Sequence, residues 1–140
     1  MRRRAGYGTA VALFATIIAL APATSSARSC QTRVLTAGES GRSIVLHPCD
    51  RLTLRLTEAS DGGYLWAVAR RPRAGVLKLV SQTRVPSTTC TPPCVGGNDT
   101  HVYVYRATGA GRTALALSER RPFEPHAAPI ARFTVTLEVR

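Results

Sequence analysis

Two segments of the chain alternate polar and apolar residues without a break, and this pattern most constrains the fold. Residues 51–57 read Arg-Leu-Thr-Leu-Arg-Leu-Thr, and residues 133–139 read Phe-Thr-Val-Thr-Leu-Glu-Val. A period of two places every second side chain on one face of a strand, so each segment is predicted to be a half-buried strand. No stretch beyond residue 23 keeps a period of 3.6, which predicts little helix.

Five further short runs, rich in β-branched, aromatic or aliphatic residues, complete a set of seven predicted strands. They span residues 43–46, 64–68, 76–80, 102–105 and 112–118. Seven short antiparallel strands with turn residues between them predict an all-β, immunoglobulin-like sandwich of two sheets. Cys49 and Asp50 are expected to form the first hairpin turn, and Trp66 is expected to fill the space between the sheets.

The N-terminal residues have the pattern of an export signal. Arg2 to Arg4 form a basic region, an apolar run covers residues 11–21, and Ala21-Pro22-Ala23 offers a cleavage site. The run is shorter than the roughly 20 residues of a membrane span, although an uncleaved anchor is the alternative. We therefore expect a signal peptide at residues 1–23, an N-terminal segment at 24–34 and one domain at 35–140. The protein is expected to be secreted or extracytoplasmic, without stable membrane insertion.

The chain is strongly basic, with a formal net charge of +11. A charge of this size is compatible with nucleic-acid binding, but the arginines are scattered along the sequence. They cluster only at residues 70–73 and at 120–121. A solvated basic surface is therefore favoured over a nucleic-acid site, and no nucleic-acid partner is expected.

Four cysteines, Cys30, Cys49, Cys90 and Cys94, follow the expected signal peptide. An even number in an exported chain predicts two disulfides, for which three connectivities are possible. The pairs Cys90–Cys94 and Cys30–Cys49 are favoured, and the first would close a ring already stiffened by two prolines. The alternative of a zinc site lacks a second ligand pair at suitable spacing, so no metal or other cofactor is expected.

Three turn-rich stretches, residues 58–63, 90–98 and 120–126, occupy alternating connections between the predicted strands. Strands of an antiparallel protein reverse direction at each connection, so every second connection returns to the same end. These stretches are therefore predicted to form one composite surface, and the function is placed there.

The motifs on these stretches resemble those of the chagasin family, exported inhibitors of papain-like cysteine proteases. They are Gly63-Tyr64-x-Trp66, Gly96-Gly97 and Arg121-Pro122-Phe123, and the resemblance covers about residues 35–139. It implies a monomeric, reversible inhibitor that inserts three loops from one end of the sandwich into a protease's substrate cleft. The residues expected to contact the protease are Ser60, Asp61, Gly62, Gly63, Tyr64, Val95, Gly96, Gly97, Asn98, Arg121, Pro122 and Phe123.

The chain departs from the family pattern in two of the three motifs. Residues 59–62 read Ala-Ser-Asp-Gly where the family has Asn-Pro-Thr-Thr, and Cys94 stands at the first glycine of the second motif. A binding module of the cell envelope that kept the scaffold and lost inhibition is therefore the alternative function.

Each candidate residue also has a structural interpretation. Gly62 and Gly63 are compatible with a plain hairpin turn, and Phe123 is compatible with a buried core position. An enzyme built on Ser60, Asp61 and His126 is not expected, because no nucleophile elbow or positioned base accompanies them.

Overall fold

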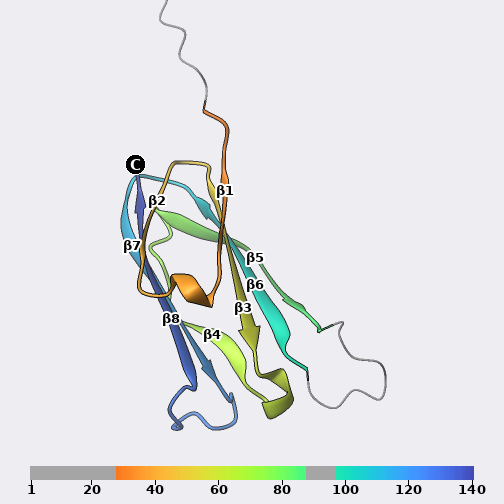
Figure 1. Ribbon diagram of the computed structural model, residues 1–140. Helices are drawn as coiled ribbons and strands as arrows, with labels where there is room; N and C mark the ends of the chain where they lie inside the picture. The colour runs from red at the N-terminus through yellow and green to blue at the C-terminus, as the bar shows by residue number, and fades with distance from the viewer. Residues whose placement is uncertain (1–27, 88–96) are drawn as a thin grey trace, which may run out of the picture.

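The computed structural model describes residues 28–87 and 97–140, which contain eight strands and two short 3₁₀ turns (Figure 1). The strands are β1 (Thr32–Leu35), β2 (Ser43–Leu46), β3 (Arg51–Glu58), β4 (Leu65–Arg70), β5 (Leu77–Val85), β6 (Asp99–Ala107), β7 (Gly111–Arg120) and β8 (Ala131–Val139). The turns are η1 (Ala37–Glu39) and η2 (Ser60–Gly62). The expected signal peptide lies outside the described residues, as do Cys90, Cys94, Val95 and Gly96. No helix within the described ranges is long and apolar enough to cross a membrane.

Two four-stranded sheets face each other, which confirms the predicted all-β sandwich. The first sheet has the order β1-β3-β6-β5, and the second has the order β2-β8-β7-β4. The strands were expected to be antiparallel, but β1 pairs with β3 and β2 pairs with β8 in parallel. The other four pairs are antiparallel. Both parallel pairs form at the same side of the sandwich, where the chain enters the fold.

The hairpin expected at Cys49 and Asp50 is absent. β2 lies in the second sheet and β3 in the first, so this connection carries the chain from one sheet to the other. Cys49 has a φ of 76°, and the Asp50 carboxylate accepts hydrogen bonds from the amides of Gln31 and His47, both at 2.8 Å. These two hydrogen bonds are the main cause of the lowered pKa of Asp50, which therefore stays ionised and holds the crossing in place.

The strand β1 covers the last three residues of the expected N-terminal segment, 24–34, and the first residue of the expected domain. No strand was predicted in this region. Only Leu35 of its four residues is buried, so the segment lacks the alternation that identified the longer strands. A disulfide between Cys30 and Cys49 joins this segment to the crossing between the sheets, with the two Cα atoms 5.4 Å apart. This confirms one of the two expected cysteine pairs.

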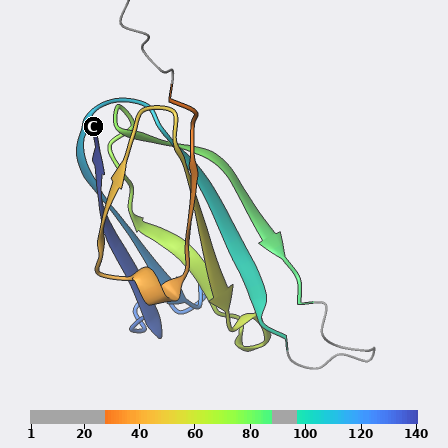
Figure 2. The ribbon, with the colours of Figure 1, turned by 45° about the horizontal axis from the view of Figure 1, so that its top comes forward.

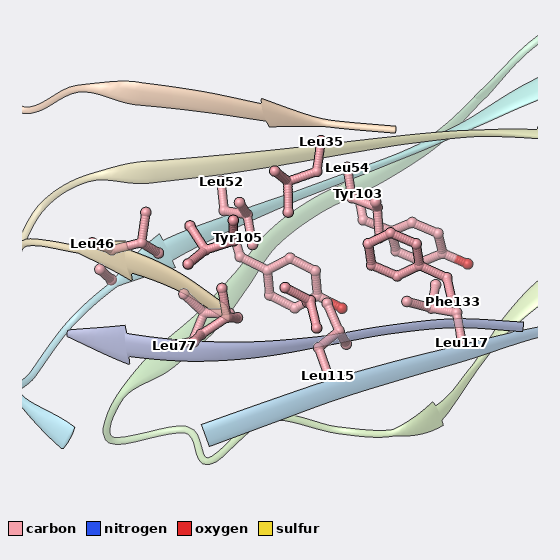
Figure 3. Close-up of a cluster of buried hydrophobic side chains, with 14 of the residues drawn as sticks. Leu35, Leu46, Leu52, Leu54, Leu77, Tyr103, Tyr105, Leu115, Leu117 and Phe133 are labelled. Atoms are coloured by element: carbon pink, nitrogen blue, oxygen red, sulfur yellow. The ribbon is translucent and has the colours of Figure 1, made fainter. Parts of the chain in front are cut away.

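The core is formed by inward side chains of both sheets (Figure 3). Leu52, Leu54 and Leu56 of β3 are fully buried, as the alternation predicted. They pack in the cluster that also contains Tyr103 of β6 and Phe133 of β8. A side chain of this kind contributes roughly 1.5–3 kcal/mol when it is transferred from water to such an interior. Trp66, predicted to lie between the sheets, is 5% exposed and belongs to the same cluster.

Candidate functional site

The described parts of three connections lie at the end of the sandwich farthest from the C-terminus (Figures 1 and 2). They are residues 59–64 between β3 and β4, residues 86–98 between β5 and β6, and residues 121–130 between β7 and β8. Below, this surface is called the loop end, and the connections are the first, second and third loops. Of the second loop, residues 86, 87, 97 and 98 are described.

The first loop is an arch between the two sheets and not a plain hairpin turn. Its backbone closes through hydrogen bonds from Gly62 to Ala59 and from Gly63 to Ser60, at 3.1 and 3.0 Å. Gly63 has a φ of 73°, in the left-handed region that glycine adopts without a steric penalty. A Cβ on Gly62 would lie 3.0 Å from the Tyr64 ring, so a side chain at position 62 would have to displace that ring.

Two buried carboxylates hold the ends of the first loop. Glu119, on β7, accepts a hydrogen bond from the amide of Ala59 at 2.6 Å. Glu58, which is fully buried at the end of β3, accepts one from the amide of Trp66 at 3.1 Å. The Trp66 indole in turn donates to the Thr57 carbonyl at 2.8 Å. The arch is therefore fixed at its entry by a strand of the second sheet and at its exit by a strand of the first.

Glu58 is compensated by positively charged and polar neighbours. Arg84 of β5 forms an ion pair with its carboxylate, and His101 Nδ1 lies 3.4 Å from the second oxygen. Burial lowers the pKa of His101 below its usual 6.5, although the carboxylate opposes the shift. The imidazole stacks on Tyr103 with 4.4 Å between the ring centroids, and the Tyr103 hydroxyl donates to the Trp66 carbonyl at 2.9 Å. This network forms a rigid base under the first loop.

The first and second loops are joined through the side chain of Ser60. Its hydroxyl donates to the carbonyl of Gly97 at 2.7 Å and accepts from the amide of Asp99 at 3.3 Å. The hydroxyl therefore points into the protein and not to solvent. Asn98, the next residue of the second loop, is exposed.

The third loop contacts the first through Arg121. The guanidinium Nε donates to the Gly62 carbonyl at 2.8 Å, and Nη1 bonds the Glu124 carboxylate at 3.1 Å. The same group lies over the Tyr64 ring, 4.5 Å from its centroid, and 5.9 Å from that of Phe123. These contacts form a cation–π cluster at the tip.

Phe123 is the most exposed large apolar side chain among the described residues, at 70%. The alternative interpretation of this residue as part of the core is therefore wrong. A Cβ on Gly63 would lie 3.2 Å from the Phe123 ring, which shows how closely the first and third loops approach. An exposed aromatic ring next to a glycine backbone gives the loop end an apolar tip of low side-chain bulk.

A cavity of about 480 Å³ lies beside this base, between the edge strands β4 and β5. Its lining includes Trp66, Arg84, His101, Arg120 and Pro122. The Nε atom of Arg120 is buried there and has no hydrogen-bond partner among the described residues.

Of the twelve residues predicted for the site, ten are described, and the structure brings members of all three loops into direct contact. Sequence reasoning missed the supporting residues Glu58, Glu119 and Arg84. The two carboxylates had a usable signal, because they continue the inward positions of β3 and β7 after alternating leucines. No group of histidine, cysteine or acidic residues in the described ranges could hold a metal ion.

Comparison with protein families gives one match, to a family described as chagasin family peptidase inhibitor I42, over residues 46–137. No curated protein sequence matches the chain. Among solved structures, the cysteine protease inhibitor EhICP2 from Entamoeba histolytica is similar with a TM-score of 0.70 and 18% identity, covering 81% of this chain and 100% of that one.

Two more solved structures share the fold. The solution structure of Amebosin has a TM-score of 0.60 and 21% identity, and covers 81% of this chain and 100% of its own. PbICP-C, solved in complex with falcipain-2, has a TM-score of 0.56 and 17% identity, and covers 80% of this chain and 93% of its own.

Proposed function

The chain belongs to the chagasin family of peptidase inhibitors, whose members inhibit papain-like cysteine proteases, and we propose that its loop end enters the substrate cleft of such a protease. The expectation that the protein is an inhibitor and not an enzyme agrees with this membership. The observation that carries the proposal is the set of contacts joining the three loops, with Phe123 exposed at their tip.

Binding of this kind is favoured because the loops are already ordered. Association loses less conformational entropy when the contacting segments are held before the partner arrives. Ser60 ties the first loop to the second, and Arg121 ties it to the third. The loop end can therefore act as one wedge and not as three independent segments.

The mode of inhibition follows from the backbone at Gly62 and Gly63. Without Cβ atoms, this segment can lie close against the catalytic cysteine of a protease. The 3₁₀ turn and the left-handed Gly63 keep its peptide bonds out of the extended conformation of a substrate. Inhibition is therefore reversible and noncovalent, and Phe123 supplies the apolar anchor of the interface.

The test is inhibition of papain by the purified protein and its variants. Phe123→Ala removes an exposed ring, so we expect unchanged thermal stability and a loss of about 2 kcal/mol in binding, or roughly 30-fold in the inhibition constant. Val34→Ala, which shortens a side chain that is 53% exposed far from the loops, is the matched control and leaves inhibition unchanged. Gly62→Arg is expected to abolish inhibition, because its side chain would displace Tyr64.

The second candidate, a binding module without inhibitory activity, is favoured by Asp61 and Gly62 in place of the family's threonine pair. It predicts no inhibition of papain at tens of micromolar, with capture of a non-protease partner that is indifferent to Phe123→Ala. That pair of results would overturn the proposed inhibition.

We also propose that the protein is exported. The basic and apolar pattern of residues 1–23 supports this, and the Cys30–Cys49 disulfide is of the kind that persists in oxidising compartments. The measurement is mass spectrometry of the protein recovered from the medium or cell envelope of its producing cells. An N-terminus at residue 24 is the expected result, and recovery of the intact chain from the cytoplasm would contradict it.

A further inference from the structure

We propose that the outer face of the first sheet binds a linear anionic polysaccharide at the end opposite the loops. The inference starts from the register of three strands. Arg51 of β3 lies directly opposite Arg106 of β6, and Arg106 lies directly opposite Lys78 of β5. All three are exposed, and residues directly opposite each other on adjacent strands have their side chains on the same face, so the three share the outer face. They are called the cationic row below.

Among the described residues, no carboxylate occupies an outward position of the first sheet beside the cationic row. Outward positions of the first sheet carry a fourth cation, Arg55, and otherwise threonine, serine and valine. None of these four cations forms an ion pair within the described residues. Within the described residues, Arg84, Arg112, Arg121 and Arg140 pair with acidic residues, whereas the cationic row, like Arg42 and Arg132, does not.

Like charges placed directly opposite each other on adjacent strands destabilise a sheet. Here two such pairs share Arg106, and neighbouring strands are about 4.8 Å apart. An arrangement that opposes folding and lacks a local counter-charge is typical of a surface that meets an anionic partner. A chain with an anionic group on successive units can neutralise the whole row at once.

The neutral residues on this face distinguish among polyanions. A membrane-binding surface usually inserts tryptophan, phenylalanine or leucine, whereas the exposed apolar residues of this face are valines such as Val34 and Val80. Single-stranded nucleic acids are bound by stacking on aromatic rings, and no aromatic residue occupies an outward position here. Threonine hydroxyls on the same face, at Thr53 next along β3 from Arg51 and at Thr83 farther along β5, suit the hydroxyl-rich edge of a saccharide.

The position of the cationic row keeps the proposed protease site free. Arg51 begins β3 and Glu58 ends it at the loop end, so the two surfaces are separated by about 23 Å along the strand. Figure 1 shows β3 running between these two ends of the sandwich. A polysaccharide on the row would hold the protein at a surface with its loops directed away.

The experiment uses immobilised heparin as a probe and measures the salt concentration that elutes the protein, with the salt dependence of binding in solution. Arg51→Gln/Arg106→Gln is compared with Arg42→Gln/Arg132→Gln, a control that removes the same charge from exposed positions outside the row. We expect the row variant to elute at lower salt, with its log–log salt slope reduced by about two, roughly one per cation. The control is expected to elute close to the wild type.

Thermal unfolding gives an independent readout. Because the row variant loses two like-charge contacts, its melting temperature is expected to equal or exceed that of the wild type. Equal losses of heparin binding in both variants would show a net-charge effect and overturn the proposal. Binding to anionic phosphatidylserine vesicles or to oligo(dT) with the same dependence on the row, and stronger than to heparin, would also overturn it. Papain inhibition plays no part in these readouts, so they stand if the proposed inhibition fails.

Discussion

Replacing Arg84 by methionine tests whether the ion pair with Glu58 supports the loop end. The Glu58 carboxylate is fully buried, and the variant would leave it without its main positive neighbour. Breaking a fully buried pair costs about 3–5 kcal/mol. The Arg84 side chain is 40% exposed, so water offsets part of this loss and we expect about 2 kcal/mol.

Equilibrium unfolding in urea is the appropriate assay. For an m value of about 2 kcal/mol/M, this loss lowers the midpoint by about 1 M. The control Arg132→Met changes an exposed arginine that forms no ion pair with any residue the structure describes, and a surface change of this kind stays within about 0.5 kcal/mol.

A double variant distinguishes an unpaired charge from lost packing. In Glu58→Gln/Arg84→Met the amide oxygen can still accept from the Trp66 amide, and position 58 no longer carries a buried charge. This variant is expected to be more stable than Arg84→Met alone. If the double variant is the less stable of the two, or if Arg84→Met unfolds at the wild-type midpoint, the reasoning is refuted.

Three further predictions concern the backbone, the pH response and the crosslink. Gly63→Ala forces an alanine into the left-handed region and against Phe123, so we expect the free energy of unfolding in urea to fall by about 1–2 kcal/mol. A decrease below about 0.3 kcal/mol would contradict this geometry. His101 has a lowered pKa in the folded state, so its contribution to stability is complete above its unfolded value of 6.5 and is lost as the pH falls through the folded pKa. His101→Phe should therefore reduce the fall in melting temperature between pH 7 and pH 5, and an unchanged profile would exclude this group as its source. Cys30→Ser/Cys49→Ser removes a crosslink between residues 19 apart and should lower the free energy of unfolding by about 3 kcal/mol. Reduction of the wild-type disulfide should lower the melting temperature by the same amount as this double substitution.

Local patterns predicted those parts of the fold that are decided within one strand. The alternation in residues 51–57 and 133–139 fixes which side chains face the core, whatever the partner strands are. Trp66 was placed correctly for a similar reason, because a large aromatic ring in a strand is most stable when buried. β1 has four residues and one buried side chain, so its pairing with β3 is a tertiary effect that leaves little trace in the sequence.

The candidate site shows more clearly that contacts between distant segments cannot be predicted from local sequence patterns. Alternating connections predicted that the three loops share one end, but the inward hydroxyl of Ser60 follows from the position of Gly97, which lies 37 residues away. The cationic row is a stronger case, because Arg51 and Arg106 are widely separated in the sequence and become neighbours only through strand register. In the linear sequence the same arginines are scattered and show no cluster.

Both described chain ends lie away from the loops, at the end of the sandwich where β1 begins and β8 finishes (Figure 1). Thr32 is paired with Arg51, and the amide of Arg140 donates to Leu46 at 3.1 Å. Affinity tags, fluorescent reporters or a second copy in tandem can therefore be fused after Arg140, or between the expected signal peptide and Arg28, without covering the tip. The scaffold is suited to genetic fusion and to display on a phage or cell.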